Sequence, residues 1–498
     1  MESRCFDLVG GIQRIMYTAY ANQIDEEALY SGRSNRTSDI RFSPIVGGLL
    51  VTIWMAICMA GFGIMFLARQ PVVGAAIIAV PTFVGMLMKP TFALCVMMLV
   101  LPTGAGLGYA GVFSLDRGIG IALAVSFVIN ALITRPGIHM RNRALWIVGL
   151  YTLWIVLASL AGQHLSFELR RAFTQFQLLI LFLITFWILE TNGPKTLIWT
   201  LRSYVFGTLG TIILAIATGA AIRAVQETGE VRYAATLGRA IDANMLGALV
   251  ALAFLAAVYL FARDKSAMWR IIYLGAILFL PLMMLRIGSR GAIVALALTM
   301  LSPLVFVRQV LRRPALAALL IVAIVVASLS AGLLVKKTGL EDPVAQRLTD
   351  VGYAKESFDS RMRPISKAVE TAITRPMGTS FYGWFEESGL TIYPHSDFFL
   401  VLGVYGIPGA ILFALLLVFT VLIVRRTALG LEKIYSRSTF IFLLAMGLTI
   451  GQVYKKYFWV FLAVVIAIER ISWLYAEMAD ERTHEETADI DYLPYVSQ

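Results

Sequence analysis

The chain has 498 residues, of which 59% are hydrophobic and only 15% are charged, and its mean hydropathy is +0.78. A soluble domain has about 45–50% apolar and about 25% charged residues, so this composition excludes a soluble globular enzyme and a disordered protein. The net charge of +11 would suggest nucleic-acid binding in a soluble chain. We expect no nucleic-acid partner here, because an excess of Lys and Arg is also typical of the cytoplasmic loops of membrane proteins.

The apolar residues come in segments of the length that crosses a bilayer, which is about 20 residues for a helix. In chain order the segments are 44–67, 71–88, 91–110, 118–134, 144–161, 173–190, 203–221, 242–262, 270–285, 290–307, 315–334, 397–424, 438–453 and 457–475. We therefore predict an all-α polytopic membrane protein with about 12–14 transmembrane helices. Residues 1–43 form an N-terminal tail and residues 476–498 an acidic, flexible C-terminal tail.

The distribution of Lys and Arg predicts the orientation of these helices. The connections 135–143, 263–270, 308–313 and 425–437 are the most basic, and the helix count places all four on one side together with both termini. This side is expected to be cytoplasmic. The outer side then receives 162–172, 222–241, 286–290 and the long segment 335–396, in which we predict a helix over Ser366–Ile373 and a turn at Arg375–Gly378. Long ordered loops are usually functional, so the active surface is expected there.

The long outer segment ends at a histidine. Pro394, His395, Ser396 and Asp397 precede the helix that begins at Phe398, and Ser396 or Asp397 is predicted to cap that helix. The cap would hold the imidazole of His395 at the membrane surface. Histidine is the commonest general base near neutral pH, although a solvated surface histidine is an alternative interpretation.

Two arginines, Arg286 and Arg290, interrupt the apolar sequence at the outer side, with Gly288 between them. On a continuous helix, residues four apart share one face, and two guanidiniums can bind pyrophosphate oxygens in bidentate fashion. The alternative is that both side chains extend from the helix ends to the membrane interface. Arginines are less common on the outer side than in cytoplasmic loops. Their presence there favours the binding of an anionic ligand over a purely structural role.

A similar group, with Arg232, Arg239, Asp242 and Asn244, precedes the helix at 242. The alternative to a ligand site is that Asp242 caps the helix and Arg239 pairs with Asp242 at the surface. If these arginines converge with His395, they form an outer pocket for an anionic, membrane-bound substrate. The sequence contains no P-loop, zinc-protease or EF-hand motif, so neither a metal nor another cofactor is expected.

The order of these motifs resembles a known family. The stretch from Arg286 to Ala292 is followed by Pro376 and Gly378, then by His395 and Ser396, and finally by Gly403, Gly406 and Gly409. This order resembles the O-antigen ligase and Wzy-type polysaccharide polymerase superfamily of bacterial inner membranes. Ser396 stands where the family often has Asn, Tyr405 where it often has Glu, and Ala243 where it often has Pro.

The resemblance implies a GT-C-like, metal-independent glycosyltransferase with its active site on the periplasmic side. The donor would be a glycan on undecaprenyl pyrophosphate, and the acceptor either the lipid A core (a ligase) or another lipid-linked glycan (a polymerase). Carried over by motif, Arg290 and Arg239 would neutralise the pyrophosphate, His395 would activate the acceptor hydroxyl with inversion at the anomeric carbon, and Arg286 and Arg232 are further phosphate ligands. Between the two activities, the sequence favours the ligase slightly.

Two other classes of protein stay open. The main one is a polysaccharide flippase or other transporter, and the second is a scaffold without catalytic activity. Ion-coupled transporters usually carry ionisable residues within their spans, and we find no Asp, Glu or His near the middle of any predicted helix. This observation and the single long outer segment favour the enzyme.

Overall fold

The computed structural model describes residues 57, 60, 71–103, 115–134, 143–162, 164–217, 222–224, 231–233, 243–301, 351–390, 392–428 and 430–491. The predicted spans 315–334 and most of 44–67, together with the N-terminal tail, Arg239 and Asp242, lie outside these residues. Six helices in the described part are long and apolar enough to cross a membrane. The predicted fold class, an α-helical polytopic membrane protein, is therefore confirmed.

The helices are α4 (Pro71–Met88), α5 (Pro90–Val100), α6 (Leu115–Thr134), α7 (Arg143–Leu160), α8 (Leu165–Ala217), α9 (Ala243–Arg263), α10 (Ala267–Ile287), α11 (Arg290–Leu301), α15 (Val351–Thr374), α16 (Gly383–Ser388), α17 (Asp397–Arg426), α18 (Leu431–Gly447) and α19 (Lys456–Asp491). One feature departs from an all-helical fold. The short strands β1 (Ile222–Ala224) and β2 (Val231–Tyr233) pair in antiparallel fashion, with Arg223 opposite Arg232.

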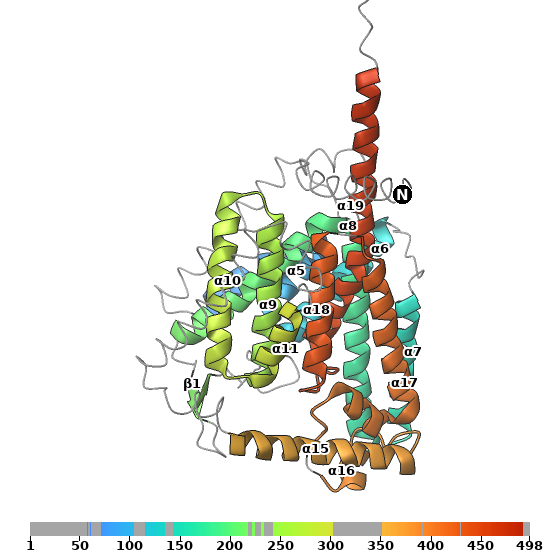
Figure 1. The fold of residues 1–498 in the computed structure, drawn as a ribbon. Coiled ribbons are helices and arrows are strands. Elements are labelled where there is room, and N and C mark those ends of the chain that lie inside the picture. Colours follow the sequence, from blue (N-terminus) through green and yellow to red (C-terminus); the bar gives the residue numbers. More distant parts are fainter. Residues whose placement is uncertain are drawn as a thin grey trace, which may run out of the picture.

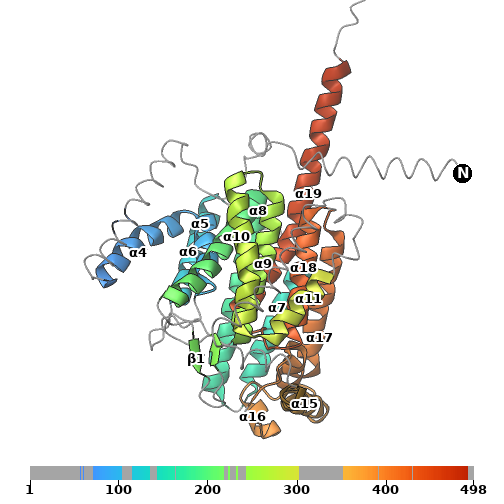
Figure 2. The ribbon, with the colours of Figure 1, turned by 60° about the vertical axis from the view of Figure 1, so that its left-hand side comes forward.

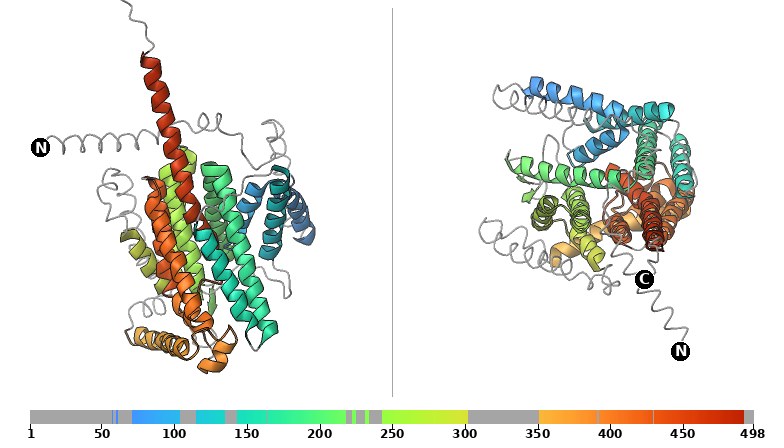
Figure 3. Two further views of the ribbon diagram at one scale, coloured as in Figure 1. Left: turned by 90° about the vertical axis from the view of Figure 1, so that its right-hand side faces the viewer. Right: turned by 90° about the horizontal axis from the view of Figure 1, so that it is seen from above.

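The long helices form a bundle, and α15 lies across one end of it (Figure 1). Helix α16 is at this same end, which we call the α15 end, whereas α19 extends from the opposite end (Figures 2 and 3). The α9–α10 and α17–α18 connections, which carry predicted basic loops, lie at the opposite end (Figure 1). The α10–α11 junction, predicted for the outer side, lies at the α15 end, and so does the α18–α19 junction (Figure 1).

Two helices form the centre of the bundle. Every residue of α9 from Leu246 to Ala257 is buried, as is every residue of α19 from Tyr457 to Ile468. Helix α9 packs against α8, α10, α11 and α18, and α19 packs against α8, α17 and α18. Small residues are frequent in α9, and they allow close helix–helix packing, which stabilises bundles in lipid where no hydrophobic driving force acts between helices.

Helix α8 contains two predicted spans, 173–190 and 203–221, joined at a sharp break. The break is at Gly193, whose φ of 70° and ψ of −155° are not helical, and Pro194 follows it. Proline cannot donate the backbone hydrogen bond that a continuous helix requires. The second half of α8 then runs obliquely back toward β1 (Figure 1). The two predicted spans therefore correspond to two helical segments that a break at Gly193 separates.

Some predicted boundaries are wrong. The span predicted at 438–453 begins at Leu431 and ends at Gly447, because the residues after it form the turn to α19. The span predicted at 91–110 ends at Val100. The predicted flexible tail is helical as far as Asp491, where α19 ends.

Helix α17 breaks at Gly406, and the segment after α15 docks into the break. Gly406 has a φ of 68° and a ψ of −169°, and the freed N–H of Ile407 donates to the carbonyl oxygen of Pro376 at 2.8 Å. Gly378, with a φ of 94°, lies so close that a Cβ there would be 2.6 Å from the carbonyl oxygen of Val404. The Pro376–Gly378 turn is therefore confirmed, and its role is to fasten the long outer segment to α17.

Replacement of Gly406 by Ala is expected to lower stability through two effects. The positive-φ backbone conformation of Gly406 would destabilise the fold by about 1–3 kcal/mol when the residue carries a side chain. The new Cβ would also be only 2.3 Å from the Pro376 oxygen. Gly193→Ala is the matched control, because Gly193 has a similar backbone conformation but no atom within 4 Å of its Cβ position. Thermal unfolding in detergent should show a larger decrease for Gly406→Ala. Equal decreases in unfolding temperature for the two variants would mean that the docking of the Pro376–Gly378 turn contributes nothing to stability.

Candidate functional site

The two predicted arginines flank a helix–helix junction. Gly288, in the left-handed conformation with a φ of 65°, ends α10, and the Ser289 hydroxyl accepts a bond from the Ala292 N–H at 3.4 Å at the start of α11. Arg286 is thus in the last turn of α10, and Arg290 is the first residue of α11. Gly288 turns the chain between them, so the arginines lie on two separate helices, as the predicted spans 270–285 and 290–307 require, and the shared face of a continuous helix does not arise.

Arg290 lies in a position suited to an anion. Its Nε and Nη2 atoms are buried, and it occupies the first turn of α11, where helix N–H groups and the helix dipole favour negative charge. Arg286 is half-buried in the preceding helix. A guanidinium and a helix N-terminus at the same place are a suitable combination for a phosphate group.

The start of α9 lies beside the start of α11. The Ser289 hydroxyl donates to Asn244 Oδ1 at 3.0 Å, and a Cβ on Gly247 would be 2.8 Å from the Ser289 Cβ. The structure thus brings together Asn244, from the predicted group at 232–244, and the Arg286–Arg290 stretch. Arg232 lies in β2, which packs against α10, whereas Arg239 lies outside the described residues.

The start of α17 is fixed by Asp397 in a way the sequence did not predict. Ser396 occupies the N-cap position in an extended conformation but makes no capping hydrogen bond. The Oδ1 atom of Asp397 accepts the N–H groups of Gln452 at 2.6 Å and Val453 at 2.8 Å. The predicted cap is therefore wrong, because the buried carboxylate binds the α18–α19 turn instead. His395, two residues earlier, is exposed.

The α18–α19 turn connects the histidine to the arginines. Thr449 in this turn lies against Gly291, where a Cβ would be 2.8 Å from the threonine Oγ1, and Gln452 in the same turn binds Asp397. Arg290 precedes Gly291 and His395 lies two residues before Asp397, so these contacts hold both residues at the same end of the bundle. The site joins the N-termini of α9, α11 and α17 at the α15 end.

Replacement of Asp397 tests this connection. Asp397→Ala leaves two buried N–H groups without their acceptor, at a cost of about 1–3 kcal/mol for each, whereas Asp397→Asn keeps a carbonyl oxygen for both. We expect the Ala variant to lose thermal stability and the Asn variant to stay close to the wild type. If Asn is as damaging as Ala, the carboxylate charge rather than its acceptor oxygen fixes the turn.

A second carboxylate holds the loop between α15 and α17. Glu168, fully buried near the start of α8, accepts the Phe381 N–H at 3.0 Å and the Tyr382 N–H. The guanidinium of Arg171 lies 4.3 Å from the centre of the Phe381 ring. Sequence reasoning missed Glu168, since the only signal it gives is an acidic residue in the first turn of a helix.

Tyr393 packs the end of this loop just before His395. Its ring centre is 4.2 Å from that of Phe381 and 4.3 Å from that of Phe385, and its hydroxyl donates to the Phe381 carbonyl at 3.1 Å. Burial raises the pKa of the Tyr393 phenol well above its ordinary value. The phenol therefore stays neutral and keeps donating this bond, which orders the chain leading into His395.

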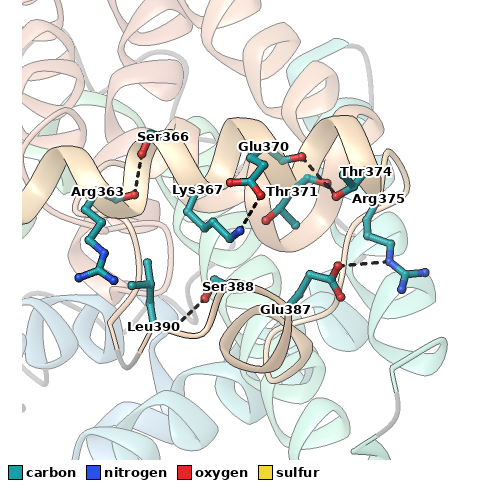
Figure 4. A network of polar contacts seen from close by, with 10 residues as sticks. All are labelled: Arg363, Ser366, Lys367, Glu370, Thr371, Thr374, Arg375, Glu387, Ser388 and Leu390. Atoms are coloured by element: carbon teal, nitrogen blue, oxygen red, sulfur yellow. Dashed lines mark hydrogen bonds and ion pairs between the residues drawn. The ribbon is translucent and has the colours of Figure 1, made fainter.

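The charges of α15 pair with one another and with α16 on the surface (Figure 4). Lys367 lies 2.6 Å from Glu370, and Arg375 lies 3.7 Å from Glu387, with both pairs partly or largely exposed. Exposed pairs contribute about 0–1 kcal/mol. These residues show no link to the Arg290–His395 site.

In the part of the chain that the structure describes, no group of three or more His, Cys, Asp or Glu residues could hold a metal.

The fold defines a multi-pass α-helical membrane protein. Arg290, at the start of α11, and His395, just before α17, lie at the same end of its bundle (Figure 1). Residues 277–414, from the middle of α10 into α17, match the family model Wzy_C, described as O-antigen ligase. The predicted resemblance is confirmed. Arg286, Arg290 and His395 lie within the matched residues, whereas Arg232 and Arg239 precede them. No curated protein matches the chain.

Proposed function

We propose that the protein is a membrane glycosyltransferase that moves a glycan from undecaprenyl pyrophosphate to an acceptor hydroxyl. The acceptor is a sugar of the lipid A core in a ligase, which we slightly favour, or a second lipid-linked glycan in a polymerase. The observation that carries this proposal is the pair of contacts, Asp397 to Gln452 and Gly291 to Thr449, that holds His395 and Arg290 at one end of the bundle. The reaction needs a base for the acceptor and positive charge for the leaving group in one place.

In this mechanism His395 accepts the proton of the acceptor hydroxyl as its oxygen attacks the anomeric carbon. The bond from that carbon to the pyrophosphate oxygen breaks on the opposite face, so the configuration inverts. Negative charge develops on the pyrophosphate, and preorganised donors at such a position are usually the largest electrostatic contribution to catalysis. Arg290 and Arg239 supply these donors, with Arg286 and Arg232 as further phosphate ligands.

The proposed location is the bacterial inner membrane, with both termini in the cytoplasm and the α15 end in the periplasm. The placement of the basic α9–α10 and α17–α18 connections at the other end supports this orientation, because such loops stay on the cytoplasmic side.

Incubation of the purified chain with an undecaprenyl-pyrophosphate-linked oligosaccharide, with and without lipid A core, tests the proposal. Modified core that depends on His395 would identify a ligase, and a ladder of longer glycans without core would identify a polymerase. If a folded protein forms no product from a range of donors, the transferase assignment is wrong and a flippase becomes the better assignment.

Chelation of divalent metals is expected to leave transfer unchanged, because arginine side chains in this mechanism take the role that a metal ion has elsewhere. The measurement is the initial rate of transfer after dialysis against EDTA, compared with the same sample after magnesium is restored. A reproducible loss that magnesium reverses would contradict the metal-independent mechanism.

A further inference from the structure

Helix α15 has an exposed apolar face in addition to the face that packs on the bundle. Its packed face consists of Pro364, Ala368, Thr371 and Ala372, all buried. The exposed face carries Met362, Val369 and Ile373, with exposed fractions of 40%, 41% and 76%, and Met377 follows at 61%. The spacing of seven and four residues along the helix places the first three on one side. An apolar surface of this kind needs a partner.

The position of this face relative to the bundle indicates what the partner is. The break at Gly406 divides α17, and the part from Ile407 to Arg426 has 20 residues, the length of a bilayer-spanning helix. Ile407, Ile411, Leu415, Val418 and Leu422 are exposed along this part. They form an apolar stripe of the kind that faces lipid.

The end of the exposed face of α15 is fastened to the start of the exposed stripe on α17. Pro376, next to Met377, binds the N–H of Ile407, which is the first residue of the exposed stripe on α17. The candidate span covers all of α17, Asp397–Arg426. If the part inside the bilayer is the 20 residues after the break, the C-terminal end of α15 lies where the bilayer surface meets the protein. Helix α15 lies crosswise to the bundle at this level (Figure 1), as a helix in the plane of the membrane surface does.

The charges of α15 agree with a lipid surface. Helix α15 as a whole has four basic and three acidic residues, and its charge becomes basic toward the C-terminal end, where the segment from Arg361 to Arg375 contains four basic residues and one acidic residue. Basic polar faces are typical of helices that bind anionic lipid headgroups. Arg363 and Lys367 lie on the side of α15 that faces Ser388 and Leu390 (Figure 4). The polar and apolar side chains are thus separated around the helix.

We propose that α15 is an interfacial helix, whose Met362, Val369 and Ile373, together with Met377, insert among the acyl chains of phospholipids at the α15 end. Its role is to hold the segment that leads to His395 at the membrane surface, where a lipid-linked substrate presents its headgroup. The lipid contact itself does not depend on the proposed chemistry.

The experiment uses the full chain with its native cysteines, Cys5, Cys58 and Cys95, replaced by serine. A single cysteine at Ile373→Cys carries a bimane probe, and the protein is reconstituted in phosphatidylcholine–phosphatidylglycerol vesicles with nitroxide-labelled acyl chains. Thr374→Cys is the matched control, since Thr374 is also exposed and points about 100° away around the helix. Val369→Cys is a second probe on the apolar face.

We expect the nitroxide lipid to quench the probes at 373 and 369 about twofold or more strongly than the probe at 374. Equal quenching at 373 and 374, or none at either, would overturn the proposal. Blue-shifted emission at 373 without quenching would also overturn it, because a protein surface rather than lipid would then cover the face. None of these outcomes depends on transfer activity, so the inference and the proposed function can fail separately.

Discussion

Transfer by an Arg290→Lys protein is expected to be about 10²–10³-fold slower than by the wild type, which corresponds to the loss of about 2.7–4 kcal/mol of transition-state stabilisation. Lysine keeps the charge but not the planar fork that binds two phosphate oxygens at once. The buried Nε and Nη2 atoms of Arg290 also leave little room for a different geometry. The measurement is the initial rate of product formation with a saturating lipid-linked donor.

Two further variants make this result specific. Arg286→Lys, on the other side of Gly288, is expected to reduce the rate less, because the proposed mechanism uses Arg286 only as a further phosphate ligand. Arg270→Lys changes an exposed arginine at the other end of α10 and should leave the rate unchanged. A rate for Arg290→Lys equal to that of Arg270→Lys would remove Arg290 from the mechanism.

His395→Gln is expected to reduce transfer by about 10²–10⁴-fold, the usual contribution of a general base. Glutamine can form a hydrogen bond with the acceptor hydroxyl but cannot take its proton. Because His395 is exposed, the substitution should leave thermal stability unchanged. Rates are measured together with a thermal unfolding curve for each protein.

The control for this variant is another histidine at the same end. His164 lies 2.9 Å from Glu386, and both side chains are close to half exposed. His164→Gln therefore removes this exposed pair and the packing of the His164 ring on Tyr382, whose ring centre is 4.0 Å away. We expect at most a small decrease in its rate. Similar losses for both histidine variants would indicate a general effect on this end of the protein rather than catalysis by His395.

The sequence predicted the fold where a single physical signal dominates. Apolar length placed α4 at 71–88 and located α9, α10 and α17 to within a few residues, because lipid requires continuous apolar helices. Motif order also predicted the resemblance to the family whose model matches residues 277–414, and the structure places the motif residues Arg290 and His395 at one end of the bundle (Figure 1).

What the sequence could not predict are contacts between distant segments. The role of Glu168 depends on backbone N–H groups more than 200 residues away, and Asp397 binds a turn rather than its own helix. The predicted spans 270–285 and 290–307 placed a break at this stretch, but only the structure shows that Gly288, in the left-handed conformation, ends α10 there. These features depend on tertiary packing, which leaves no periodic pattern in the sequence.

The most direct test of the proposal that His395 and Arg290 form one site is a double-mutant cycle. Initial rates of glycan transfer from the undecaprenyl-pyrophosphate donor are measured for wild type, His395→Gln, Arg290→Lys and the double variant. Residues that act together in one catalytic unit give strongly non-additive losses, so the double variant should be little slower than the slower single variant. Losses that multiply, or wild-type rates in either single variant, would contradict the account.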